Sequence, residues 1–232
     1  MSRQPTLSGI RACVFDAYGT LFDVHSAVER HRNRVGDQAD AVSGLWRRKQ
    51  LEYAWLRSLM HSHADFATVT EQALDHALGA YGIGDGELRR DLLDAYRALD
   101  CYPEVPGTLR ALRSLGLPTA LLSNGSPDML ADAVNSAGLG DLLDAVISIE
   151  DVGIYKPAPE AYRLAVDRLG VPASAILFHS SNGWDVAGAA CFGFRVAWIN
   201  RGNVPADVLP GDAELVLPGL AEVPRLLGAE SA

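Results

Sequence analysis

Apolar residues follow two different patterns along this chain. A short unbroken apolar run, Ala12–Phe15, ends abruptly at Asp16, and such a run is typical of a strand buried on both faces. From about residue 23 to residue 99 the apolar spacing is helical and no strand pattern occurs. The predicted helices of this segment cover Phe66–Tyr81, Asp85–Leu99 and a stretch in which Leu45, Trp46, Leu51, Trp55 and Leu59 lie near one face.

After Tyr102 and Pro103 the pattern changes to strands that alternate with helices. The alternation predicts an α/β fold, a doubly wound parallel sheet with helices on both faces. The all-helical segment is then an insertion after the first strand, so residues 1–22 and 100–232 form a core domain and residues 23–99 a cap domain. The predicted strands are Pro118–Leu122, Ala145–Ile149, Ala175–Phe178, Arg195–Ile199 and Glu214–Leu217. The predicted helices are Thr108–Leu115, Asp128–Ala137, Ala158–Leu169 and Trp184–Cys191.

Composition narrows the partners that the protein can have. The 232 residues are 48% hydrophobic and 21% charged, an ordinary globular mix, and carry a formal net charge of −9. An acidic surface repels nucleic acid and anionic membranes, so neither is an expected partner. The three cysteines lack a paired spacing, no segment has the roughly 18 apolar residues of a membrane span, and residues 1–11 lack a signal-peptide pattern. A cytoplasmic location is therefore expected.

Polar side chains follow several predicted strands at the point where each strand ends. Ligands of a doubly wound sheet bind outside the carboxyl ends of its strands, so these side chains are the candidates for chemistry. They are Asp16, then Ser123 and Asn124, then Glu150 and Asp151 with Lys156 beyond, then Ser180, Ser181, Asn182 and Asp185.

Two of these residues, Asp16 and Lys156, each allow a structural and a functional interpretation. A carboxylate beside a buried strand is costly unless it is paired or used, although Asp16 can also cap a turn through backbone hydrogen bonds. Lys156 can supply the countercharge that keeps Asp16 ionised, or it can be a surface lysine in its Tyr-Lys-Pro-Ala-Pro loop. The two residues alone leave both interpretations open.

Taken together and in this order, the motifs resemble the haloacid dehalogenase superfamily. Its four landmarks correspond to Asp16–Thr20, Ser123-Asn124, Lys156 and Asp185, and its cap domain occupies the place of the helical insertion. The finer resemblance is to the L-2-haloacid dehalogenase (type II) branch. The segments that carry it are Phe15-Asp16-Ala17-Tyr18-Gly19-Thr20-Leu21-Phe22-Asp23, Leu45-Trp46-Arg47, Lys49-Gln50-Leu51-Glu52-Tyr53, Trp55-Leu56-Arg57, Ser123-Asn124-Gly125-Ser126, Tyr155-Lys156-Pro157 and Ser180-Ser181-Asn182-Gly183-Trp184-Asp185.

Most members of that superfamily are magnesium phosphatases, and Tyr18 argues against this activity. The phosphatases carry an acidic residue at this position, which protonates the leaving oxygen of the phosphoester. Tyrosine is a poor acid for this purpose at neutral pH, whereas a departing halide needs no proton. The tyrosine therefore favours displacement of a halide.

The resemblance implies a covalent mechanism. Asp16 would attack the carbon that bears the halogen, and Asp185 would activate the water that cleaves the resulting ester. Arg47 and Asn124 would bind the halide, since a guanidinium keeps its charge at working pH. The substrate-binding wall implied by the family is Ala17, Tyr18, Leu51, Phe66 and Trp184.

The resemblance also implies residues that support the two carboxylates. Lys156 and Thr20 would hold the nucleophile, Ser123 would bind the substrate carboxylate, and Tyr162 would lie behind the site. Asn182 and Ser180 would position the water. The full catalytic set implied by the family is Asp16, Thr20, Arg47, Ser123, Asn124, Lys156, Tyr162, Ser180, Asn182 and Asp185.

The expected activity is hydrolysis of small (S)-2-haloacids to (R)-2-hydroxyacids through an aspartyl ester, with inversion and with no cofactor or metal. The expected partners are the anionic haloacid and the halide ion, and the family implies a homodimer. Alternatives are hydrolysis of fluoroacetate or azetidine-2-carboxylate on the same scaffold, a magnesium-dependent phosphatase, and a non-catalytic protein that binds small acids. Three departures from the branch, at Arg48, His179 and Gly183, leave selectivity open, as do the preferred halogen and chain length. A histidine at position 179 either titrates near neutral pH or is packed and hydrogen-bonded.

Overall fold

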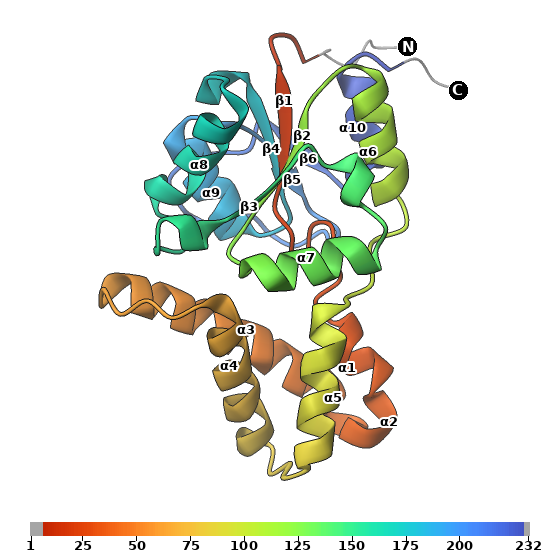
Figure 1. Ribbon diagram of the computed structural model, residues 1–232, viewed down its shortest axis with the longest axis vertical. Helices are drawn as coiled ribbons and strands as arrows, with labels where there is room; N and C mark the ends of the chain where they lie inside the picture. Colours follow the sequence, from red (N-terminus) through yellow and green to blue (C-terminus); the bar gives the residue numbers. More distant parts are fainter. Residues whose placement is uncertain (1–6, 230–232) are drawn as a thin grey trace.

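A parallel sheet organises the fold. The computed structural model describes residues 7–229, and within them the sheet has six strands in the order β3-β2-β1-β4-β5-β6, each pair parallel (Figure 1). The order reverses beside β1, and this is where ligands bind in doubly wound sheets. The predicted fold class is confirmed. The strands are β1 (Ala12–Phe15), β2 (Thr119–Ser123), β3 (Ala145–Ser148), β4 (Ile176–Ser180), β5 (Arg195–Ile199) and β6 (Leu215–Leu217).

Helices cover both faces of the sheet. Helices α6 (Val105–Ser114) and α10 (Val223–Leu226) lie on one side of it and α8 (Pro159–Leu169) and α9 (Gly183–Phe192) on the other (Figure 1). Helix α7 (Pro127–Ser136) crosses below the sheet, at the end where the strands terminate. Because both faces are covered, every residue of β1, β2 and β4 is buried, as their apolar sequences predict.

Helices α1 to α5 pack together as a helical insert at the carboxyl end of the strands (Figure 1). Two linkers join this insert to the rest of the chain, and they pair with each other. The N–H of Asp23 donates to the carbonyl of Asp100 at 2.8 Å, and the N–H of Tyr102 donates to the carbonyl of Leu21 at 3.0 Å. The chain therefore enters and leaves the insert side by side. The helices are α1 (Ser26–Arg30), α2 (Arg32–Val35), α3 (Ala39–Leu59), α4 (Phe66–Ala80) and α5 (Gly86–Arg97).

Capping residues explain where two of these helices begin. The Asp65 carboxylate accepts a hydrogen bond from the N–H of Thr68 at 2.7 Å, so α4 begins at Phe66, as predicted. The Asp85 carboxylate accepts from the N–H groups of Glu87 and Leu88, so Asp85 is the N-cap of α5 rather than its first residue.

Two strands extend further at their carboxyl ends than the sequence predicts. Strand β2 includes Ser123, which pairs with Ser148, and β4 continues through His179 to Ser180. The polar side chains suggested an end to each strand, but backbone pairing with neighbouring strands continues past them. His179 pairs with Phe15 on one side, and its ring stacks on the Phe15 ring at 4.4 Å, so this histidine packs as an aromatic core residue.

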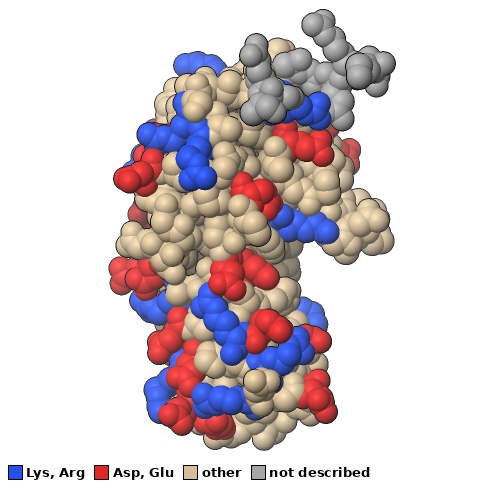
Figure 2. Space-filling model, turned by 90° about the vertical axis from the view of Figure 1, so that its right-hand side faces the viewer, with Lys and Arg blue, Asp and Glu red and all other residues tan. Residues whose placement is uncertain are grey.

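Charges of both signs are mixed on the surface of the helical insert. Figure 2 shows basic and acidic side chains interleaved over one face of it. Ion pairs join Arg30 to Asp100 and Arg32 to Glu29 and Asp40. The negative net charge is therefore locally compensated on this face. Among residues 7–229, no helix combines the length and apolar character that a membrane crossing requires.

Candidate active site

The carboxylate of Asp16 lies where β1 ends, and it is 5% exposed. The chain turns directly afterwards at Gly19, whose φ of +91° favours glycine. This turn returns Thr20 to the carboxylate, and the Thr20 hydroxyl donates to Asp16 Oδ2 at 3.1 Å. Asn182 Nδ2, from the N-terminus of α9, donates to the same oxygen at 2.9 Å. Two strand ends thus hold one carboxylate oxygen in place.

Lys156 lies between two carboxylates and is completely buried. Its Nζ is 3.1 Å from Asp16 Oδ1 and 3.0 Å from Asp185 Oδ2. One buried ammonium group thus faces two buried carboxyl groups. The interpretation of Lys156 as a surface lysine is wrong.

Asp185 is completely buried in the first turn of α9. Burial raises the pKa of its carboxyl group above the ordinary value, and the neighbouring Lys156 ammonium opposes this rise. The Tyr162 hydroxyl donates to Asp185 Oδ1 at 2.7 Å. Burial and the negative charge of Asp185 raise the pKa of Tyr162 well above its ordinary value, so the phenol stays neutral and donates. The pair gives Asp185 a fixed orientation and the character of a base.

Asn124 has one amide atom engaged and one unused, and it is joined to the backbone of Lys156. Its Oδ1 accepts from the backbone N–H of Lys156 at 3.0 Å, which identifies the other amide atom as Nδ2. That nitrogen has no partner in the described part of the chain, so it is available to a ligand. Ser123 and Ser180 instead use their hydroxyl oxygens to accept the N–H groups of Gly125 and Asn182, respectively. In this structure the two serines shape their loops.

Arg47 reaches the site from α3 of the helical insert. Its Nη1 donates to Gln50 Oε1 at 2.8 Å, while its Nη2 lies 3.4 Å from both the Tyr18 carbonyl and Asn182 Oδ1. The guanidinium is thus close to the Asp16 loop, yet it forms its short hydrogen bond within its own helix. Arg48, the departure beside it, is exposed to solvent.

Aromatic rings form one wall of the site. The Tyr18 ring lies 5.5 Å from the Tyr96 ring and 5.6 Å from the Phe66 ring, centroid to centroid. Burial raises the pKa of Tyr18 well above its ordinary value, so its hydroxyl is an even poorer acid than free tyrosine. Trp184 lies farther out, edge to face with Trp55 at 5.4 Å. Of the other predicted wall residues, Ala17 is completely buried and Leu51 is half-buried.

Two departures from the family pattern have a structural explanation. Burial lowers the pKa of His179 to about 4, so of the two alternatives for this histidine the packed and hydrogen-bonded one holds. A Cβ atom at Gly183 would lie 2.3 Å from Asp207 Oδ2, so a carboxylate fills the space that the glycine leaves.

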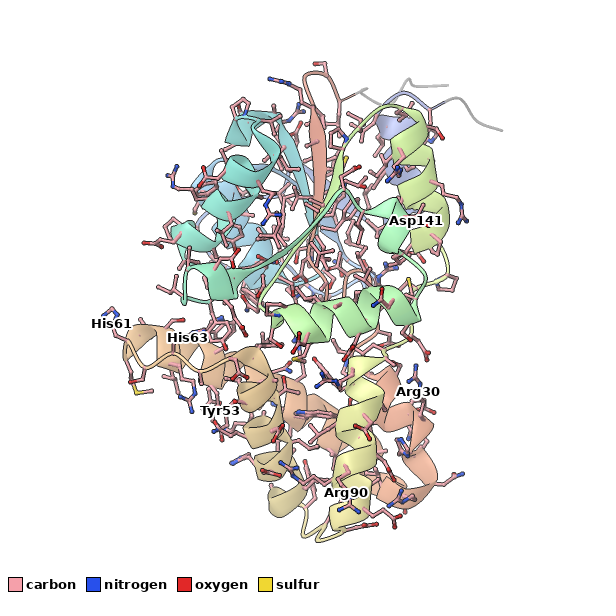
Figure 3. The ribbon with its side chains drawn as sticks, in the orientation of Figure 1. Arg30, Tyr53, His61, His63, Arg90 and Asp141 are labelled. Atoms are coloured by element: carbon pink, nitrogen blue, oxygen red, sulfur yellow. The ribbon has the colours of Figure 1, made fainter. Side chains whose placement is uncertain are left out.

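The paired histidines of the α3–α4 loop lie apart from the site, with His61 at the outer tip of α3 (Figure 3) and the His63 ring 5.2 Å from the Tyr155 ring.

Gln50 is a site residue without a predicted role, and Glu150 is not at the place that its position after a strand predicts. Gln50 lies in the buried stripe of α3, between Trp46 and Ala54, and a polar residue in an apolar stripe is the signal that could have identified it. Glu150 turns away from the strand ends, and its Oε1 accepts the N–H of Phe66 at the start of α4 at 3.2 Å. It therefore links the sheet to the helical insert.

Comparisons with known proteins agree with this geometry. A family model described as haloacid dehalogenase-like hydrolase matches residues 10–193. The (S)-2-haloacid dehalogenase 1 of Pseudomonas sp. (strain CBS-3) is 48% identical over 94% of this chain and 96% of its own length. The (S)-2-haloacid dehalogenase 4A of Burkholderia cepacia is 49% identical over 86% of this chain and 87% of its own.

A solved structure extends the likeness to the whole fold. The L-2-haloacid dehalogenase from Xanthobacter autotrophicus with chloropropionic acid covalently bound superposes with a TM-score of 0.86, at 39% identity over 96% of this chain and 100% of that one. The chain is a hydrolase and belongs to the haloacid dehalogenase-like family, as its motifs predict. Within that family the chain is similar to (S)-2-haloacid dehalogenases.

Proposed function

We propose that this protein is an (S)-2-haloacid dehalogenase that hydrolyses small (S)-2-haloacids to (R)-2-hydroxyacids. The observation that carries the proposal is the fixed carboxylate of Asp16, which keeps one acceptor position unused. A carboxylate offers about four acceptor positions. Asp16 Oδ2 accepts from Thr20 and Asn182, whereas Oδ1 accepts only from Lys156 among the described residues. Oδ1 is therefore the oxygen with room to attack. Relatives named for this activity, one with chloropropionic acid covalently bound, support the proposal.

In the first step, Asp16 Oδ1 attacks C2 of the haloacid and the carbon–halogen bond breaks. The bonding pair leaves with the halide, which the Arg47 guanidinium and Asn124 Nδ2 receive. The new bond is an ester between the Asp16 carboxyl group and C2. Because attack comes from the side opposite the halide, C2 is inverted.

In the second step, water attacks the carboxyl carbon of Asp16 and the ester bond between that carbon and the substrate oxygen breaks. Asp185 takes one proton of the water and passes it to the departing C2 oxygen, which becomes the product hydroxyl, while the second proton leaves to solvent as Asp16 returns to its carboxylate form; the raised pKa of Asp185 suits this role as a base. Lys156 stabilises the negative charge that develops on the Asp16 carboxyl group. No bond to C2 changes in this step, so the inversion of the first step is kept in the (R)-2-hydroxyacid.

The alternatives fit the site less well. A phosphatase needs an acid near the leaving oxygen, and Tyr18 has a raised pKa in an aromatic cluster. Opening of azetidine-2-carboxylate releases an amine that is positively charged, and the Arg47 guanidinium would repel it. A halide is the leaving group that suits an arginine at this position.

We also propose that residues 23–99 form a cap domain over a core domain of residues 1–22 and 100–232. The pairing of the two linkers supports these boundaries, while residues 1–6 and 230–232 of the core domain lie outside the described residues. The proposed enzyme is a cytoplasmic homodimer. The exposed apolar side chains of Leu59 and Met60, at the end of α3, support an association, which size-exclusion chromatography with light scattering tests.

The test of the function is halide release from L- and D-2-chloropropionate in the presence of EDTA. The expected result is release from the L enantiomer alone, with D-lactate as product, and a loss of about 10⁴-fold or more in Asp16→Asn. A single turnover in ¹⁸O-water should place the label in Asp16 and leave the first product molecule unlabelled. Release from neither enantiomer would overturn the proposal, and parallel assays with fluoroacetate, azetidine-2-carboxylate and a phosphoester with magnesium would then identify the alternative.

A further inference from the structure

Gln50 is a completely buried amide whose every polar atom has a partner. Its Nε2 donates to the Thr70 hydroxyl oxygen at 2.7 Å. Its Oε1 accepts from Arg47 Nη1 at 2.8 Å and from the Tyr96 hydroxyl at 3.1 Å. Residues from α3, α4 and α5 thus meet at one side chain. A buried amide held by three hydrogen bonds from two directions is fixed in one orientation.

The hydrogen bonds also decide which way the amide faces. Thr70 has a single hydroxyl hydrogen, and it donates this hydrogen to the carbonyl of Phe66 at 2.7 Å. The Thr70 oxygen can then only accept, so the amide nitrogen of Gln50 must face it. The carbonyl oxygen of Gln50 consequently faces Arg47, and the orientation does not depend on the arginine being present.

Arg47 has a partner but no counterion. The described residues include no carboxylate within 4.0 Å of its guanidinium, whereas Lys156 has two at 3.0 and 3.1 Å. A neutral amide oxygen fixes the guanidinium through one N–H and leaves its full positive charge. Its Nη2 lies 3.4 Å from the Tyr18 carbonyl and from Asn182 Oδ1, so these two contacts with protein acceptors are long.

We propose that Gln50 is a positioning residue that holds Arg47 as an uncompensated cation for the departing halide. The inference rests on the proposed function, since it assigns the residue that makes Arg47 fit for that role. The neutral amide does what a carboxylate could not do, because a carboxylate would orient the guanidinium and also cancel its charge. Tyr96 and Thr70 keep the amide in place from the two neighbouring helices.

The test compares Gln50→Glu, which has the same shape and a negative charge, with Gln50→Met, which has similar length and no acceptor. The control is the same pair of changes at Gln72, an exposed glutamine whose Oε1 also accepts from an arginine, Arg57, at 2.9 Å. The measurements are kcat and KM for L-2-chloropropionate and L-2-bromopropionate, inhibition by bromide, and the midpoint of thermal unfolding.

In Gln50→Glu we expect kcat for the chloro substrate to fall by about 100-fold and the inhibition constant of bromide to rise by about tenfold or more. In Gln50→Met we expect kcat to fall by about tenfold. The kcat ratio of bromo to chloro substrate should rise in both, because chloride is the poorer leaving group and depends more on the cation. The Gln72 variants should change each quantity by less than about twofold.

Two results would overturn the proposal. In the first, the Gln50 variants fold, but bromide inhibition and the kcat ratio of bromo to chloro substrate are unchanged. A glutamine with a purely structural role predicts this result, whatever the change in kcat itself. The other is Gln50→Glu with tighter bromide inhibition than the wild type. If the wild-type protein releases no halide, the proposed function fails, and calorimetric titration of wild type and variants with sodium bromide still tests whether Gln50 governs anion binding at Arg47.

Discussion

The two sides of the active site are built in different ways. On the core side, Asp16, Lys156 and Asp185 are buried and joined by contacts of 3.0 and 3.1 Å. On the side of the helical insert, the half-buried Arg47 meets the core only at 3.4 Å. The charged groups of the core therefore hold one another in place. Arg47, by contrast, forms its shortest hydrogen bond within the insert and contacts the core only weakly. The comparison predicts that changes on the core side affect both stability and activity, and changes on the insert side activity alone.

The largest effect is expected from Lys156→Met, measured against Arg47→Met. Both variants should lose about 10³-fold or more of kcat. Lys156→Met leaves two buried carboxylates without their cation and should also lower the free energy of unfolding by about 3–5 kcal/mol. Arg47→Met removes a half-buried cation without a counterion and should change that free energy by no more than about 1 kcal/mol. Urea denaturation at neutral pH measures both values.

The pH dependence separates this explanation from a simple packing defect. In Lys156→Met, Asp185 loses the ammonium group that opposes the rise of its pKa on burial, so the folded state binds more protons than the unfolded state. The stability of the variant should therefore recover as the pH falls from 7 to 5. A destabilisation that stays constant over this range, or an equal loss in Arg47→Met, would break the comparison between the two sides.

The core side could be predicted from sequence because a parallel sheet brings its strand ends together. Asp16, Lys156, Asn182 and Asp185 were identified as residues that follow buried strands, and the structure joins them in a chain of hydrogen bonds from Asn182 through Asp16 and Lys156 to Asp185. No knowledge of helix packing was needed for this step. The same reasoning fails for Glu150, which also follows a strand but turns toward the insert.

The insert side could not be derived from the residues alone. The contact of Gln50 with Thr70 and Tyr96 depends on how three helices pack, and helical periodicity fixes only which face of each helix is buried. Arg47 entered the predicted site through family resemblance alone. The two alternatives for His179 could not be separated from sequence for a related reason, since the cost of charging it depends on the strands and rings around it.

A smaller effect on the core side is expected from Gly188→Ala, one turn after Asp185 on α9. A Cβ atom at Gly188 would lie 2.6 Å from the Tyr162 hydroxyl and 2.5 Å from Pro157 Cβ. The Tyr162 hydroxyl donates to Asp185, and Pro157 directly follows Lys156. The added methyl group should therefore displace both Tyr162 and Lys156, the two partners of the Asp185 carboxylate. We expect kcat to fall by about tenfold, with KM changed by less than about threefold.

The control for this substitution is Gly79→Ala. Gly79 also lies in a helix, α4, and a Cβ atom there meets nothing within 4 Å. Alanine at that position should leave kcat unchanged and raise stability by up to about 1 kcal/mol through its higher helix propensity. Equal kinetics in the two variants would show that α9 tolerates the methyl group and that the core side is less rigid than its contacts suggest.

The smallest effect concerns stability alone and tests how completely the core side excludes charge. His179 Nδ1 lies 3.1 Å from the Val14 carbonyl, so this nitrogen carries the hydrogen, and its Nε2 has no partner among the described residues. Its folded pKa of about 4 lies below the ordinary 6.5, so between these values the unfolded state binds more protons. Stability should therefore be full above pH 6.5 and decline toward pH 4, by about 3 kcal/mol in all.

His179→Leu isolates this contribution, because every other titrating group is shared by the two proteins. The variant should lose the hydrogen bond to Val14 at all pH values, a constant offset, but it should lack the decline that His179 causes. The difference in unfolding free energy between wild type and variant, measured in urea from pH 7.5 to 4, should therefore shift in favour of the variant as the pH falls. Parallel curves would mean that His179 titrates normally, and hence that water or a counterion reaches the strand beneath Asp16.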